Sequence, residues 1–200
     1  MDPDVVSRLR QFSEGREYKL PPRPEVVSEV LQFINDPTTD SRRLSRLVHG
    51  DPALAAHVLR VANSPAWCGR SRIVTLQQAV SRLGMGTLQE IVLCVGMSEV
   101  YRAPGHEQTA RQIWRHALGT ALYAKVVART VRENVEAAFL GGLLHSVGQP
   151  VVLRELVRHA RRKRIPAQAD EIMVVVAEQQ RTVGLGLAQA WDLPSVVQAA

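Results

Sequence analysis

Two histidines in the second half of the sequence are of the residue type that most often binds metals in proteins. His116 lies in "WRHAL" and His145 lies in "AFLGGLLHSVGQP". Small and apolar residues around each of them repeat at intervals of three and four, which places each histidine on one face of a predicted helix. On the helix that carries His145, Gly141 and Gly142 keep the face of the histidine small. The axes of the two helices can therefore approach closely. We therefore expect His116 and His145 to point toward one another.

A facing pair of histidines has two interpretations. Imidazole is a common metal ligand, but a catalytic metal typically needs three protein ligands and an open position for water. Ser146 follows His145 and offers only a neutral hydroxyl, and no Asp or Glu lies next to either histidine along its helix face. The alternative is a pair of polar side chains satisfied by the backbone or by water inside a core. The residues by themselves favour the core interpretation.

Helical periodicity runs from end to end of the sequence, so we predict an all-α protein. Helix starts are indicated by Asp51 before Pro52, and by the capping boxes that Thr75 forms with Gln78 and Thr87 with Glu90. In the first half we expect helices over about 24–36, 40–50, 52–63, 75–84 and 87–101. In the second half we expect them over about 107–131, 134–148, 151–164, 168–180 and 182–192, with a last one beginning at 193.

The segment "RAPGHEQ", residues 102–108, is the best candidate for an internal boundary. It divides the chain into a lead-in helix over 1–17, an N-terminal helical subdomain over 18–103 and a helical bundle over 104–200. The last residues form an apolar run with no helix-ending signal, so we expect the natural chain to continue beyond Ala200.

Composition is that of a soluble globular protein, with 46% hydrophobic and 22% charged residues. Cys68 and Cys94 have no metal-type spacing, which favours a reducing compartment. The first residues carry acids and arginines rather than an apolar run, and the longest apolar stretch is interrupted by polar residues and a proline. We therefore expect a cytoplasmic protein with no membrane span.

Much of the net charge of +6 comes from one cluster in "RELVRHARRKR". Its members are Arg158, Arg161, Arg162, Lys163 and Arg164. A solvated helix end is the simpler interpretation, because cations are favourable at a helix C-terminus. A site for phosphate or another anion is the alternative. No nucleic-acid reading motif accompanies the cluster, so nucleic acid is not an expected partner.

Several ordered blocks resemble the HDOD domain family over about residues 18–200. They are "LPPRPEVVSEVLQFINDP", "LVHGDPALAAHVLRVANSPAWCG", "TLQQAVSRLGMGTLQEIVL", "WRHAL", "AFLGGLLHSVGQPVVL" and "VGLGLAQAWDLPSVV". The resemblance implies an N-terminal helical subdomain followed by a bundle similar to the HD-type metal phosphohydrolases, including the HD-GYP phosphodiesterases.

The resemblance also implies a vestigial HD pocket. His116 matches the first metal-binding histidine of those hydrolases, and His145 matches the histidine of their His-Asp doublet, but Ser146 replaces the aspartate. Gln180 stands where active relatives often carry a further histidine, and Gln149 where HD-GYP members often carry lysine. Serine and glutamine lack the charge that holds a dication and acidifies its bound water. The implied protein has no catalytic residues, no metal and no cofactor.

The resemblance implies a bacterial signal-transduction module that regulates by binding other proteins, such as response regulators or proteins of cyclic-di-GMP pathways. The groove between the subdomain and the bundle is one docking place that it suggests. Trp67, in "NSPAWCG", is either an exposed anchor for such a partner or a buried cover of the subdomain core. Three other functions stay open: a receptor for a nucleotide or another small anion in the vestigial pocket or at the arginine cluster, nucleic-acid binding, and a residual phosphohydrolase.

Overall fold

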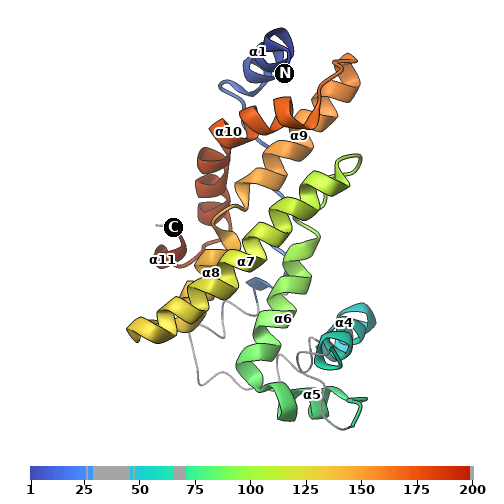
Figure 1. The fold of residues 1–200 in the computed structure, drawn as a ribbon, viewed down its shortest axis with the longest axis vertical. Coiled ribbons are helices and arrows are strands. Elements are labelled where there is room, and N and C mark those ends of the chain that lie inside the picture. The colour runs from blue at the N-terminus through green and yellow to red at the C-terminus, as the bar shows by residue number, and fades with distance from the viewer. Residues whose placement is uncertain (26, 29–45, 47, 65–70, 199–200) are drawn as a thin grey trace. The chain divides into compact units, whose positions relative to one another are not determined.

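The structure is a computed structural model that describes residues 1–25, 27, 28, 46, 48–64 and 71–198. Every regular element in these ranges is a helix and none is a strand, which confirms the all-α prediction (Figure 1). The chain forms two compact units. One consists of Met1–Pro22 and Val100–Ala200, and the other of Arg23–Glu99. In the part of the chain described, no helix has the length and apolar character needed to cross a membrane.

The Arg23–Glu99 unit contains α4 (Pro52–Ala62), α5 (Leu76–Leu83) and α6 (Met85–Ser98). Its helix starts are mostly those expected. The Asp51 carboxylate accepts hydrogen bonds from the backbone at the start of α4, and Thr75 and Gln78 form the predicted capping box of α5. Two helices were expected over 24–36 and 40–50. Most residues of these two ranges lie outside the part of the chain that the structure describes.

The capping box expected from Thr87 and Glu90 is wrong. The α6 helix begins two residues earlier, directly after Gly84, and has no side-chain cap. Gly84 is the C-cap of α5 and the N-cap of α6, with φ of 78°. Because glycine adopts positive φ without steric cost, one residue can end the first helix and begin the next.

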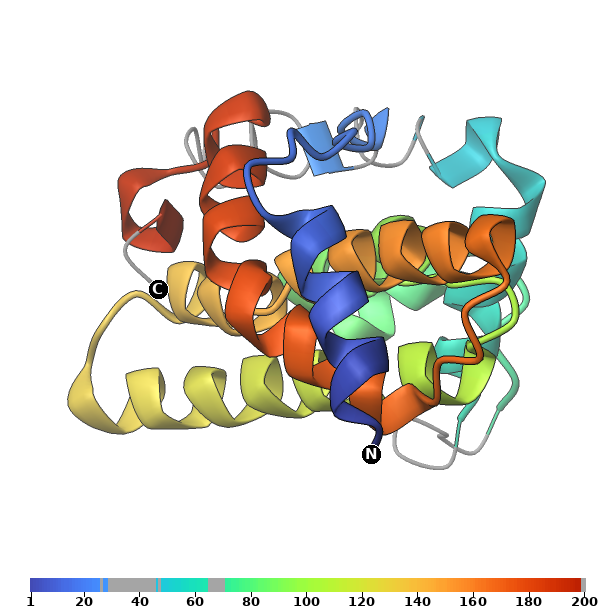
Figure 2. The ribbon, with the colours of Figure 1, turned by 90° about the horizontal axis from the view of Figure 1, so that it is seen from above.

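The other unit is built from helices that pack in pairs. They are α1 (Pro3–Ser13), α7 (Glu107–Val131), α8 (Val135–Leu144), α9 (Gly148–Lys163), α10 (Ala169–Ala190) and α11 (Ser195–Gln198). Helix α7 packs along α8, and α9 packs along α10 (Figure 1). Helix α1 lies against α10 and also touches α9 (Figure 2).

The α7–α8 contact is as close as the small side chains predicted. A Cβ atom on Gly142 of α8 would lie 2.7 Å from the Cα atom of Ala121 and 2.9 Å from the carbonyl oxygen of Thr120. Nothing larger than a hydrogen therefore fits at position 142 without a shift of backbone. The bounds of α7 agree with the expected helix over 107–131.

The two helices expected over 168–180 and 182–192 are a single helix, so the predicted break is wrong. Helix α10 continues through Gly184 and Gly186. Gly184 faces Gly148 of α9, and a Cβ atom on Gly148 would overlap the carbonyl oxygen of Gln180. Glycine at 148 and 184 thus permits close packing of two helices and does not interrupt α10.

The N-terminal residues attach to α10 by polar contacts. The backbone N–H of Asp2 donates to Glu171 Oε1 over 2.5 Å, and Arg10 Nη2 lies 2.6 Å from Glu178 Oε1. The helix expected as a lead-in over 1–17 is therefore part of the same compact unit as α10.

Candidate functional site

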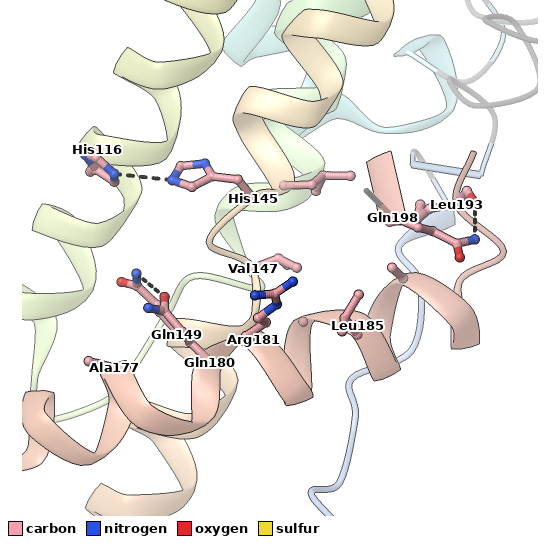
Figure 3. A pocket seen from close by; sticks show the side chains of 13 residues that line it. His116, His145, Val147, Gln149, Ala177, Gln180, Arg181, Leu185, Leu193 and Gln198 are labelled. Atoms are coloured by element: carbon pink, nitrogen blue, oxygen red, sulfur yellow. Dashed lines mark hydrogen bonds between the residues drawn. The ribbon is translucent and has the colours of Figure 1, made fainter. Parts of the chain in front are cut away.

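His116 and His145 face each other, as the helix periodicity predicted (Figure 3). Their Nε2 atoms are 3.2 Å apart and the ring planes meet at 69°. His116 comes from the middle of α7, and His145 is the C-cap residue of α8. The close α7–α8 contact at Gly142 fixes the distance between the two helices that carry them.

Hydrogen bonding determines which nitrogen of each ring carries the proton in the neutral pair. His145 Nδ1 lies 2.8 Å from the carbonyl oxygen of Gly142, and a carbonyl oxygen can only accept. His145 therefore carries its hydrogen on Nδ1, which leaves a lone pair on Nε2. The 3.2 Å contact then requires that Nε2–H of His116 donates to Nε2 of His145.

The core interpretation of the two histidines is wrong, because both side chains are exposed. Helix α8 is buried along its last six residues and ends at Leu144. His145 is the first residue beyond this buried segment, so its ring leaves the core and reaches the surface beside α7. Helical periodicity places His145 on a face but does not show that the helix ends just before it.

The histidine pair forms one wall of a cavity of about 630 Å³. The lining residues are His116, Leu144, His145, Val147, Gln149, Ala177, Gln180, Arg181, Gly184, Leu185, Ala188, Leu193 and Gln198. Four of the five residues expected in the vestigial pocket are in this set. Gln149 Nε2 donates to Gln180 Oε1 over 2.5 Å, which joins α9 to α10 on the cavity floor (Figure 3).

Ser146 is the expected pocket residue that does not line the cavity. Its side chain is 1% exposed, and its Oγ atom has no hydrogen-bond partner. Ser146 lies in the turn between α8 and α9, where consecutive side chains point in different directions, so it is buried while His145 is exposed. The expectation that Ser146 lines the pocket with His145 is therefore wrong, because neighbouring residues of this turn face different surroundings.

Arg181, Leu185 and Gln198 line the cavity but were missed in the sequence. Arg181 directly follows Gln180, and Leu185 lies four residues further along the same helix. The incorrect helix break at 181 hid this relation. With α10 continuous, the i, i+4 spacing of Arg181 and Leu185 would have placed both side chains on one face.

The cavity does not provide the ligands of a hydrolytic metal centre. Among the residues that the structure describes, no three His, Cys, Asp or Glu side chains cluster closely enough to hold a metal ion. Carboxylates of neighbouring helices are engaged elsewhere: Glu178 pairs with Arg10, and Glu155 with Arg16 and Arg158. Two histidines and two amides contribute no negative charge, so the donor set does not fit a dication that must acidify water.

The arginine cluster at the end of α9 lies outside the cavity. Arg158 Nη1 is 2.9 Å from Glu155 Oε1, and the Arg161 guanidinium occupies the space beside Gly105 where a Cβ would stand. The pKa of Glu107 is lowered, chiefly by the backbone N–H of Gly105 and in smaller part by Arg161. Arg162, Lys163 and Arg164 are exposed, and Arg164 is the C-cap of α9 in a left-handed conformation.

Trp67, the possible partner-binding residue, lies outside the described residues.

Comparison with known proteins identifies the family. The model of the HDOD domain matches residues 20–200. A protein of Treponema pallidum (strain Nichols), described as uncharacterized, is 27% identical over 202 residues, which cover 96% of this chain and 39% of that protein. This chain thus spans well under half of that relative.

Solved structures agree on the fold. An HDOD domain protein of unknown function from Geobacter sulfurreducens superposes with a TM-score of 0.69 at 24% identity, over 98% of this chain and 68% of that one. A protein from Shewanella amazonensis SB2B, whose name assigns it provisionally to the metal-dependent phosphohydrolases, superposes with a TM-score of 0.68 at 19% identity, over 98% of this chain and 71% of that one. At these identities the similarity establishes a shared helical architecture.

Proposed function

This chain belongs to the HDOD domain family, and we propose that it is a non-catalytic regulatory module that acts by binding another signalling protein. The proposed absence of catalysis is supported chiefly by the residue composition of the cavity. Where the HD-type hydrolases hold their metal, this chain has two histidines that bond to each other and two glutamines that bond to each other.

The histidine pair supports this proposal through its lone pairs. In the neutral pair, Nε2 of His145 accepts a hydrogen bond and Nε2 of His116 donates it, so neither nitrogen offers a free lone pair. A metal that binds at either Nε2 would have to break this bond, and no carboxylate among the described lining residues would compensate its charge.

The partners that we propose are cytoplasmic signalling proteins, such as response regulators or proteins of cyclic-di-GMP pathways. Support for them comes from the family resemblance. A module without chemistry of its own can influence a pathway only through differential binding of something else. Protein partners are therefore the central expectation.

The non-catalytic part is tested by phosphodiester hydrolysis with added Mn²⁺, Mg²⁺ or Fe²⁺. The substrates are cyclic di-GMP and bis(p-nitrophenyl) phosphate, and His116→Ala and His145→Ala are the controls. We expect the wild type to release no more product than either variant. Metal-dependent turnover that both substitutions abolish would establish an enzyme.

The regulatory part is tested by capture of partners from the native organism with the purified chain as bait. We expect at least one signalling protein that also binds the purified chain when both are isolated. If no captured protein binds directly in a purified pair, the adaptor function is wrong.

A further inference from the structure

The cavity beside the histidine pair has the charge of an anion site. None of the described residues that line it is an aspartate or a glutamate, and Arg181 supplies a permanent positive charge. Arg181 makes no hydrogen bond or ion pair with any other residue in the described ranges. Its guanidinium points from α10 toward the side of the cavity formed by Val147 and His145 (Figure 3).

Neutral polar groups surround this charge and retain unused hydrogen-bonding capacity. The bond between Gln149 and Gln180 uses one N–H of Gln149 and the oxygen of Gln180. The NH₂ group of Gln180 therefore remains able to donate to a ligand. Gln198 donates from Nε2 to the carbonyl of Leu193, which leaves its own oxygen able to accept.

One wall of the cavity is apolar. Leu144, Val147, Ala188 and Leu193 line it, and all four are buried. Leu185 also lines it and is 42% exposed, which makes it one of the few large apolar side chains of the described chain left open to solvent. An apolar wall beside a few convergent polar groups is the usual construction of a small-molecule site, and the volume of about 630 Å³ lies within the usual range.

We propose that this cavity binds a small phosphate monoester with an apolar or planar body. The phosphate is held by Arg181 and by the NH₂ group of Gln180, and the body packs on Leu185 and Val147. Arginine suits a phosphate because its planar fork donates two parallel hydrogen bonds. This inference rests on the proposed non-catalytic function, since the phosphate takes the space beside the histidines without a metal.

The test is isothermal titration calorimetry in a metal-free, phosphate-free buffer with two probes, adenosine monophosphate and phenyl phosphate. We expect the wild type to bind at least one probe, and Arg181→Gln to weaken that binding by about tenfold or more. The matched control is Arg162→Gln, which removes an exposed arginine outside the cavity and should leave the affinity unchanged. Added sodium chloride should weaken binding by the wild type, because exposed charges are screened.

The proposal is overturned if neither probe binds at millimolar concentration, or if Arg181→Gln binds as tightly as the wild type. A circular dichroism melt of each variant verifies folding, and the conservative variant Arg181→Lys should retain part of the affinity. Failure of this inference leaves the proposed function intact, because partner capture and the absence of hydrolysis are measured separately. Metal-dependent hydrolysis of a probe would contradict the proposed function instead.

Discussion

His145 shows how one residue position decides what a pair of histidines can do. Because it follows the last residue of α8, its ring is exposed while its backbone stays anchored to that helix by the bond from its N–H to the carbonyl of Gly141. The Gly142 carbonyl then fixes its proton on Nδ1, and His116 completes the pair. The same two residue types that could begin a metal site therefore satisfy each other.

Ser146 gives a prediction at this scale. Its hydroxyl is buried with no hydrogen-bond partner, so Ser146→Ala should leave the free energy of unfolding unchanged or raise it by about 1 kcal/mol. Ser146→Asp should lower it, because a carboxylate would be buried without a partner. Urea denaturation of both variants measures these changes. Tight Mn²⁺ binding by Ser146→Asp, with a raised melting temperature, would show that position 146 reaches the cavity after all.

At the scale of the helix, two glycines set the geometry of the site. Gly142 allows α8 to approach α7, which brings the histidines together, and Gly148 allows α9 to approach α10, which brings Gln149 to Gln180. Each helix pair thus contributes polar side chains to the cavity lining. The positions of the cavity residues therefore depend on close helix contacts at Gly142 and Gly148, where a larger side chain would meet backbone atoms.

Substitution by alanine tests these contacts. Gly142→Ala and Gly148→Ala should each lower the free energy of unfolding by about 1–3 kcal/mol, because the added Cβ meets backbone atoms of the facing helix. Gly119→Ala is the matched control within α7. Nothing lies within 4 Å of its added Cβ, so helix propensity should raise the stability by about 0.5–1 kcal/mol. Equal effects of all three substitutions in chemical denaturation would refute the packing described.

The first turn of α10 gives a prediction about pH. Glu171 accepts hydrogen bonds from the backbone N–H groups of Asp2 and Gln168, and these bonds lower the pKa of its carboxyl. A lowered pKa in the folded state adds stability above the ordinary value near 4.5, and this stability is lost as the pH falls through the folded value. Glu171→Gln should therefore be less stable than the wild type at neutral pH, with a difference that shrinks in acid. Urea unfolding of both proteins across the acid range measures it, and a constant difference would contradict the assignment.

The helices could be predicted because their signals are local. The cap at Asp51, the capping box at Thr75 and the bounds of α7 follow from short patterns. The continuity of α10 through residue 181 could not be predicted in this way, because α10 is supported by its contact with α9, where Gly184 faces Gly148 far away in sequence. The same limit applies to the cavity: the facing histidines could be predicted from periodicity, but their exposure and the role of Arg181 depend on how several helices end and pack.

At the scale of the whole molecule, the chain combines the helical fold of the HDOD family with a cavity whose described lining contains no carboxylate. The HDOD match over residues 20–200 includes all of the Arg23–Glu99 unit and the Val100–Ala200 part of the other unit. The proposal that this chain is not a hydrolase rests on a few side chains at one cavity. Its proposed role in regulation depends on those side chains being catalytically silent.

The metal content of the purified protein tests this central claim most directly. The untagged protein is purified without chelator from cells supplied with manganese, iron and magnesium, and is analysed by inductively coupled plasma mass spectrometry beside a variant with both His116→Ala and His145→Ala. The account predicts that the wild type holds far less than one metal ion per chain, and no more than the double variant. One or more ions of manganese, iron or magnesium per wild-type chain, lost in the double variant, would contradict it.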